Sequence, residues 1–154
     1  MTQVNISITK ATVLNEVGRL TNYAGSRMGG DESEYERIST TNSDQDMLSQ
    51  FWQSACDSVT ESLKRFIVTP NHSSTSYAVT LELSSSYDTS LTDSLTTNLQ
   101  TFMTLHIVSR WYKLTNVKEA ESYALEAAAQ LDEAMSKVFY KKKPTRPSVH
   151  RNPQ

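Results

Sequence analysis

The sequence predicts a mainly α-helical domain with one short β-strand or hairpin and extended termini. Apolar residues recur at helical spacing in four segments, alternate with polar residues in one segment, and give way to lysine and proline in the last fourteen residues. The 154 residues suffice for one domain, placed at 1–140, with a basic, proline-rich arm at 141–154. The helices are expected at about 10–24, 46–66, 91–112 and 117–139.

The first helix begins after Thr9, whose hydroxyl can cap the free backbone amides. Its apolar positions follow a helical period at Val13, Leu14, Val17 and Leu20. Glycines and small polar residues then replace any sustained period, so a loop is expected over residues 25–44. A loop of this length in a small domain is typically functional or ordered by a partner.

The second helix has the broadest apolar stripe in the sequence. Ser43 or Asp44 can cap it, and acids near its start lie at the positive end of the helix dipole. Pro70 then excludes further helix. The stripe consists of Met47, Leu48, Phe51, Trp52, Ala55, Val59, Leu63 and Phe66.

Residues 76–83 alternate between apolar and polar side chains, which predicts a β-strand. A lone strand leaves backbone N–H and C=O groups unpaired. It must therefore pair either with residues 5–8 or with a strand of a neighbouring subunit. Pairing with a neighbour would make this strand a partner-binding site, and its candidate contact residues are Tyr77, Val79 and Leu81.

The third and fourth helices are expected to form an antiparallel hairpin, because only residues 113–115 separate them. The C-terminal half of the third helix is apolar nearly all round. Asn116 and Glu119 have the spacing of a capping box at the start of the fourth helix. The expected buried stripe of the fourth helix, rich in alanine and suited to close helix packing, is Ala120, Ala124, Ala127, Ala128, Leu131, Met135, Val138 and Phe139.

Charge divides the chain into an acidic body and a basic arm. Five of the fifteen Lys and Arg residues lie in the last fourteen residues, which leaves ten against seventeen acids and a formal charge of about −7 for residues 1–140. Cations on a flexible arm suit a phosphate backbone or an acidic protein groove, although a solvated disordered tail has the same composition. Prolines favour an extended arm that lies along a partner. Its candidate partner-binding residues are Lys141, Lys142, Lys143, Arg146 and Arg151.

The residues of common catalytic and metal sites are scattered. His72, His106 and His150 fall on a loop, a helix and the arm, and the four glycines form no phosphate-binding loop. His106 is interpreted as a core histidine with one satisfied nitrogen, and Cys56 as a small core residue. We therefore expect no enzyme activity, no catalytic residue, no metal and no cofactor. One cysteine, the absence of a leader pattern and the absence of an apolar run of about 20 residues predict a soluble protein of a reducing compartment without membrane contact.

Four features occur in a fixed order: the capped helix start Asp44-Gln45-Asp46-Met47-Leu48, the strand at 77–83, the helix end Val108-Ser109-Arg110-Trp111-Tyr112, and a last helix. Over about residues 44–140 this order resembles that of the small head-tail connector, or adaptor, proteins of tailed bacteriophages. The resemblance implies a structural virion protein that forms a dodecameric ring beneath the portal protein and docks tail or further connector proteins. It also implies that DNA passes through the lumen without sequence-specific binding, and that the ring assembles in the host cytoplasm before it forms the virion neck.

Two other functions are compatible with the sequence. A nucleic-acid-binding accessory protein would use the arm for phosphate contacts, but the acidic body and the lack of a basic helix face disfavour it. A small helical enzyme is disfavoured because no catalytic groups converge in the pattern.

Overall fold

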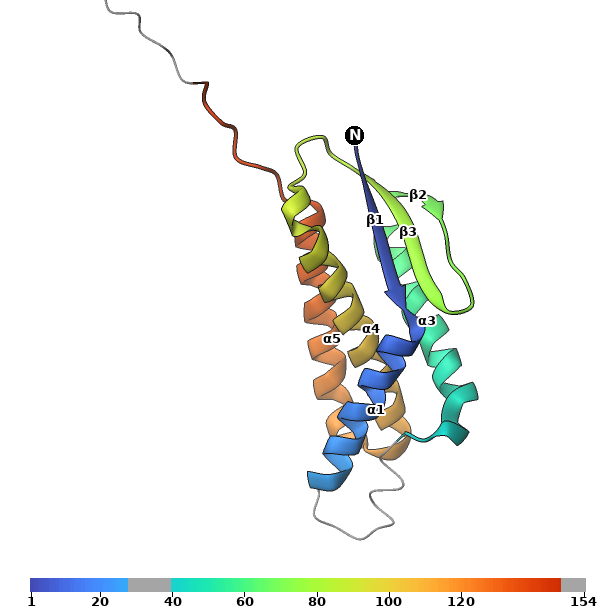
Figure 1. Ribbon diagram of the computed structural model, residues 1–154. Helices are drawn as coiled ribbons and strands as arrows, with labels where there is room; N and C mark the ends of the chain where they lie inside the picture. The colour runs from blue at the N-terminus through green and yellow to red at the C-terminus, as the bar shows by residue number, and fades with distance from the viewer. Residues whose placement is uncertain (28–39, 148–154) are drawn as a thin grey trace, which may run out of the picture.

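The computed structural model describes residues 1–27 and 40–147, which form a mainly helical body with a small antiparallel sheet (Figure 1). This confirms the mainly helical class, whereas the sheet has three strands in place of the expected single strand or hairpin. The elements in chain order are β1 (Thr2–Thr9), α1 (Lys10–Arg27), α3 (Gln45–Leu63), β2 (Ile67–Pro70), β3 (Ser76–Leu83), α4 (Thr92–Thr115) and α5 (Val117–Val138), with 3-10 turns at Asn42–Asp44 and Thr89–Leu91.

The four predicted helices and the predicted strand coincide with observed elements to within a few residues. The two ends of the loop expected at 25–44 have regular structure, because α1 continues to Arg27 and a 3-10 turn forms over Asn42–Asp44. Its middle part, residues 28–39, lies outside the described residues. At the turn, the Asp44 carboxylate accepts a hydrogen bond of 2.7 Å from the backbone N–H of Thr41, which fixes the entry into α3.

The sheet has the order β1-β3-β2, so the predicted strand is the central one. β1 pairs with β3 along its whole length, from Thr2 opposite Leu83 to Thr9 opposite Ser76. This confirms the first of the two pairings expected for the strand. Side chains alternate in both strands, and the buried set faces the helices: Val4, Ile6, Ile8, Tyr77, Val79, Leu81 and Leu83.

α4 is the central helix of the body. It packs against α1, α3, α5 and β1, and it buries residues on every side. Residues 107–112 are the segment for which the sequence predicted apolar side chains nearly all round, and five of these six residues are buried. A helix surrounded in this way has little amphipathic character, which explains why apolar residues occur on nearly every side of this segment.

A polar cluster fixes the register between α4 and α5. The buried Asn98 amide donates to the Gln130 side-chain oxygen at 2.8 Å, and the Lys137 ammonium donates to the Asn98 oxygen and to the Ser94 hydroxyl. Lys137 also lies 3.2 Å from the Glu133 carboxylate. Because a buried amide must find partners, sliding one helix past the other would be costly.

Two expectations about α5 are wrong. At its start, the backbone N–H of Glu119 donates to the carbonyl of Asn116, in place of the side-chain exchange of a capping box. Its buried seam is narrower than the predicted stripe, because α5 packs almost entirely against one helix, α4. Ala124, Ala128 and Phe139 are exposed, and the seam recurs every seven residues at Ala120, Ala127 and Ala134.

Candidate partner-binding surface

The basic arm begins where α5 ends and runs away from the body as an extended chain (Figure 1). Two backbone contacts set its direction: Lys141 forms an antiparallel bridge with Tyr87, and the N–H of Lys142 donates to the carbonyl of Ser86 at 2.8 Å. The side chains from Lys141 to Pro147 are exposed. Lys141, Lys142, Lys143 and Arg146 are therefore presented together, and Arg151 lies outside the described residues.

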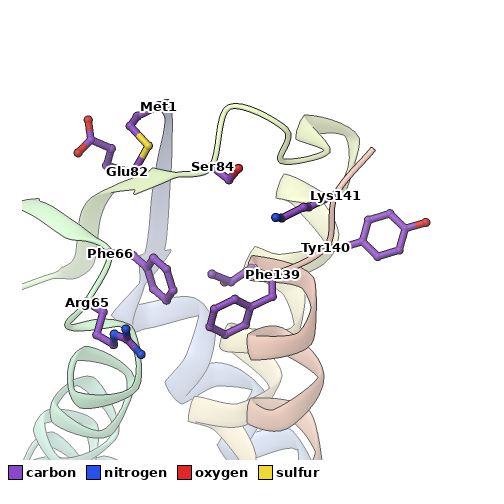
Figure 2. A pocket seen from close by; sticks show the side chains of 9 residues that line it. Met1, Arg65, Phe66, Glu82, Ser84, Phe139, Tyr140 and Lys141 are labelled. Carbon is purple, nitrogen blue, oxygen red and sulfur yellow. The ribbon is translucent and has the colours of Figure 1, made fainter. Parts of the chain in front are cut away.

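An apolar groove of about 470 Å³ lies at the root of the arm. Figure 2 shows the rings of Phe66 and Phe139 facing each other in this groove, while Tyr140 points away from it. The two phenylalanine rings meet edge to face, with their centroids 5.4 Å apart. Arg65 and Lys141 place positive charge on the rim, and the full lining is Met1, Arg65, Phe66, Glu82, Ser84, Val138, Phe139, Tyr140 and Lys141.

Phe139 and Tyr140 remain 61% and 51% exposed in the isolated chain. Adjacent exposed aromatic residues beside cations are typical of protein-binding surfaces, where aromatic and arginine side chains provide most of the binding energy. The sequence predicted the cations but not the groove. Its lining comes from four distant segments of the chain, and the local signal was limited to two aromatic residues directly before three lysines.

The structure corrects the partner-binding assignment of Tyr77, Val79 and Leu81. Their side chains are at most 1% exposed and pack in the core beneath the sheet. β1 and β2 also pair with both edges of β3, so its backbone is satisfied within the chain. The sequence showed the alternation correctly, but it could not show which strands would flank β3.

The two edge strands of the sheet are β1 and β2. Among the described residues, no backbone group pairs with the outer edge of β1, which has eight residues and neither charge, proline nor bulge. β2, at the opposite edge, has four residues, ends at Pro70 and shifts register between Ile67 and Thr69. Short length, proline and irregular register block further pairing, so the edge suited to another strand is that of β1.

His106 is a residue of α4 and lies against α3. Its Nε2 accepts a hydrogen bond of 3.3 Å from the Arg110 guanidinium and lies 3.2 Å from the Ser54 hydroxyl. Burial, assisted by the charges of Arg110 and Lys113, lowers the pKa of His106 to about 4. The neutral ring thus has one satisfied nitrogen, as predicted. Because Arg110 occupies the lone pair that a general base would need, this Ser-His pair does not form an activated nucleophile.

Cys56 and His72 both make contacts within the fold. Burial raises the pKa of the Cys56 thiol to about 12, so the thiol stays protonated at neutral pH. The His72 ring stacks on Tyr77 with centroids 4.6 Å apart, and its Nδ1 accepts from the N–H of Ala78 at 3.3 Å. Within residues 1–27 and 40–147, no three His, Cys, Asp or Glu side chains are grouped so that they could hold a metal ion.

Comparisons with protein-family models, with curated proteins and with solved structures find no match to this chain. In the described part of the chain, none of the helices combines the length and the apolar character that crossing a membrane requires.

Proposed function

We propose that the protein is a structural virion subunit, a head-to-tail connector that forms a ring beneath the portal protein. The observation that carries this proposal is the root of the arm. There, a helical body ends in an apolar groove, two exposed aromatic residues and a run of cations that leaves the body as an extended chain. The proposal includes no catalytic residue and no bound cofactor.

Physical chemistry supports an assembly role for this surface. An extended arm with prolines loses little conformational entropy when it is ordered on a partner. Burial of the apolar area of Phe139 and Tyr140 against a partner would stabilise the complex. The neighbouring cations would select an acidic partner surface. The free edge of β1 offers a second place where an extended segment can add.

The charge distribution suits a ring around DNA. The body carries a formal charge of about −7, so a lumen lined by it would repel phosphates and let DNA pass without specific binding. The basic arm contacts proteins at the periphery. In this proposal the ring has twelve copies, contacts the portal on one face and tail or further connector proteins on the other, assembles in the host cytoplasm and ends in the virion neck.

The test is the mass in solution of the purified full-length chain, alone and mixed with the portal protein encoded in the same genome. We expect a complex with many copies of this chain per portal ring, and we expect deletion of residues 141–154 to abolish it. A chain that stays monomeric and leaves the portal unchanged at micromolar concentrations would contradict the proposal. The protein should also be present in purified virions, which mass spectrometry can determine.

A nucleic-acid-binding accessory protein is the second candidate, and it is favoured by the four exposed cations between Lys141 and Arg146. Such a protein would bind double-stranded DNA through the arm, with an affinity that falls steeply with salt because bound counterions are released. The same deletion variant separates the two functions. If DNA binding disappears with the arm and falls steeply with salt, this candidate is supported; if the variant instead fails to join its ring or the portal, the connector is supported.

A further inference from the structure

We infer that the arm of one copy, residues 141–147, binds along the outward face of α5 in a second copy. The inference rests on the proposed self-association into a ring, and it names the contact that joins neighbouring subunits. It follows from the direction of the arm, from the composition of the outward face of α5, and from the match between them in charge and length.

The arm is directed away from the α5 helix of its own chain. The Lys141–Tyr87 bridge and the bond from the Lys142 N–H to the Ser86 carbonyl hold the first arm residues against the turn between β3 and α4. Beyond these contacts the chain continues outward from the body (Figure 1). An intramolecular return to α5 would break both contacts, so the surface that receives the arm belongs to another molecule.

The outward face of α5 is acidic and partly apolar. The two cations of α5, Lys118 and Lys137, lie near its ends, and Lys137 pairs with Glu133. The five acids of the helix are all exposed: Glu119, Glu121, Glu126, Asp132 and Glu133. Leu125, which is 66% exposed, lies among them beside exposed alanines. No described element covers this face, because α5 directs its seam at Ala120, Ala127 and Ala134 toward α4.

The two surfaces match in charge and in length. Residues 141–147 carry four cations and no acid, against five exposed acids of α5, of which Glu133 already pairs with Lys137. Seven extended residues span about 23 Å, and α5 rises about 21 Å from Glu119 to Glu133. Pro144 and Pro147 can pack on Leu125 and the alanines, so the contact combines apolar burial with ion pairing. The arm and the α5 face that receives it are different surfaces of the same chain. The contact is therefore heterologous, as a ring requires.

A charge exchange tests the contact in the full-length protein. In one variant Lys141, Lys142 and Lys143 are replaced by Glu, and in the other Glu121→Lys, Glu126→Lys and Asp132→Lys are combined. We expect each variant alone to self-associate at least about tenfold more weakly than the wild type, because arm and face then repel each other. The mixture of the two should regain the wild-type mass, since each arm again meets a face of opposite charge.

The control variant lowers the net charge by the same amount as the arm variant. It carries Arg19→Glu, Lys64→Glu and Lys113→Glu, at exposed sites outside the arm and α5. It should associate like the wild type. Sedimentation at about 50 and 500 mM salt gives the readout, and association should weaken at the higher salt because charges in solvent are screened. If the arm variant associates like the wild type, or the mixture regains nothing, the inference is wrong.

Crosslinking gives a second readout that keeps the native charges. Cys56 is buried and its thiol is protonated, so it contributes no background. A Thr145→Cys chain mixed with an Ala128→Cys chain should form a disulfide-linked heterodimer under mild oxidation. A Ser7→Cys chain, with its cysteine on the exposed face of the sheet, should not. Equal crosslinking at positions 7 and 128, or none at 128, would overturn the inference.

Failure of the inference and failure of the proposed function give different results. If the wild type associates and binds the portal while the charge exchange has no effect, the arm contact is wrong and the connector function stands. If the charge exchange and the crosslink behave as expected but the portal is not bound, the contact stands and the connector function fails. A wild type that remains monomeric at low salt overturns the contact.

Discussion

At the scale of single residues, His106 should make stability depend on pH. Burial lowers its pKa to about 4, whereas the unfolded chain has the ordinary value near 6.5. Well above pH 6.5 the His106 ring is neutral in both the folded and the unfolded state, so it causes no loss of stability there. As the pH falls from 6.5 toward 4, only the unfolded state binds the proton, so the free energy of unfolding decreases. At about 1.4 kcal/mol per pKa unit the loss is at most about 3 kcal/mol, and solvent near this partly exposed ring reduces it.

The measurement for His106 compares urea unfolding of the wild type and of His106→Gln at about pH 7.5 and pH 4.5. Glutamine can still accept the hydrogen bond from Arg110 but does not titrate, so the variant should lose less stability on acidification. Carboxylates contribute equally to both proteins and cancel in the difference. Equal losses in the two proteins, or an NMR titration of the His106 ring near pH 6.5, would contradict the prediction.

Removal of the Tyr112 hydroxyl should stabilise the protein. The side chain is fully buried, and its hydroxyl has no hydrogen-bond partner among the described residues. Replacement by phenylalanine keeps the edge contact with Tyr123, whose ring centroid lies 5.2 Å away. Because a buried unpaired hydroxyl is costly, Tyr112→Phe should raise the free energy of unfolding by about 1 kcal/mol.

The matched control for Tyr112 is Tyr77→Phe. The Tyr77 hydroxyl lies 3.0 Å from the Thr60 hydroxyl, so its removal breaks a hydrogen bond and should lower the free energy of unfolding by about 1 kcal/mol. Thermal and urea unfolding of the two variants should therefore shift in opposite directions. Destabilisation by both variants would show that the hydroxyl of Tyr112 has a partner in solution.

Single residues were predictable where the immediate neighbours in sequence determine the environment. His106 lies among Leu105, Ile107 and Val108, so a histidine with one satisfied nitrogen followed from the sequence, and the hydrogen bonds to its Nε2 confirm it. The ring is only half-buried, however, so it lies at the edge of the core. Phe139 was expected in the core because it continues the apolar period of α5. It is exposed because the helix ends at Val138 and the chain turns toward Tyr87.

At the scale of elements, β3 should behave as the core strand of a single chain. Leu81 is fully buried, so Leu81→Ala leaves a cavity and should lower the free energy of unfolding by about 2–5 kcal/mol. The control Ser7→Ala, on the exposed face of β1, should change it by less than about 0.5 kcal/mol. Urea unfolding at two protein concentrations distinguishes the core role from a subunit contact. A loss that disappears on dilution would mean that Leu81 is stabilised by a partner.

The sequence predicted the elements better than their neighbours. Helices and β3 follow from period and breakers, which are local properties. β2 was missed because Ile67–Pro70 is short, ends in proline and has three exposed residues, so it shows no alternation. The α5 stripe was drawn too wide because alanines occur on every side of this helix. Only the tertiary structure shows that a single neighbour, α4, selects the seam.

At the scale of the whole molecule, the two ends differ. α5 spans about 33 Å from Val117 to Val138, and it separates the groove and arm at one end from the α4–α5 turn at the other (Figure 1). The turn end exposes Leu114 and Val117, whereas the arm end exposes Phe139 and Tyr140 beside cations. The basic arm was predictable from composition. The groove was not, because Phe66 and Phe139 meet only in the folded chain.

These two ends provide a matched comparison, because Leu114 and Phe139 are both 61% exposed. Phe139→Ser and Leu114→Ser should each lower the free energy of unfolding by no more than about 1 kcal/mol, since Phe139 loses only its edge contact with Phe66. If the arm end is the assembly surface, Phe139→Ser should weaken association with the ring and the portal by about tenfold or more, as for a central aromatic anchor. Leu114→Ser should leave association unchanged. Urea unfolding and native mass spectrometry measure the two effects separately. Equal weakening by both variants would place assembly contacts at both ends, and weakening by Leu114→Ser alone would move the assembly surface to the α4–α5 turn.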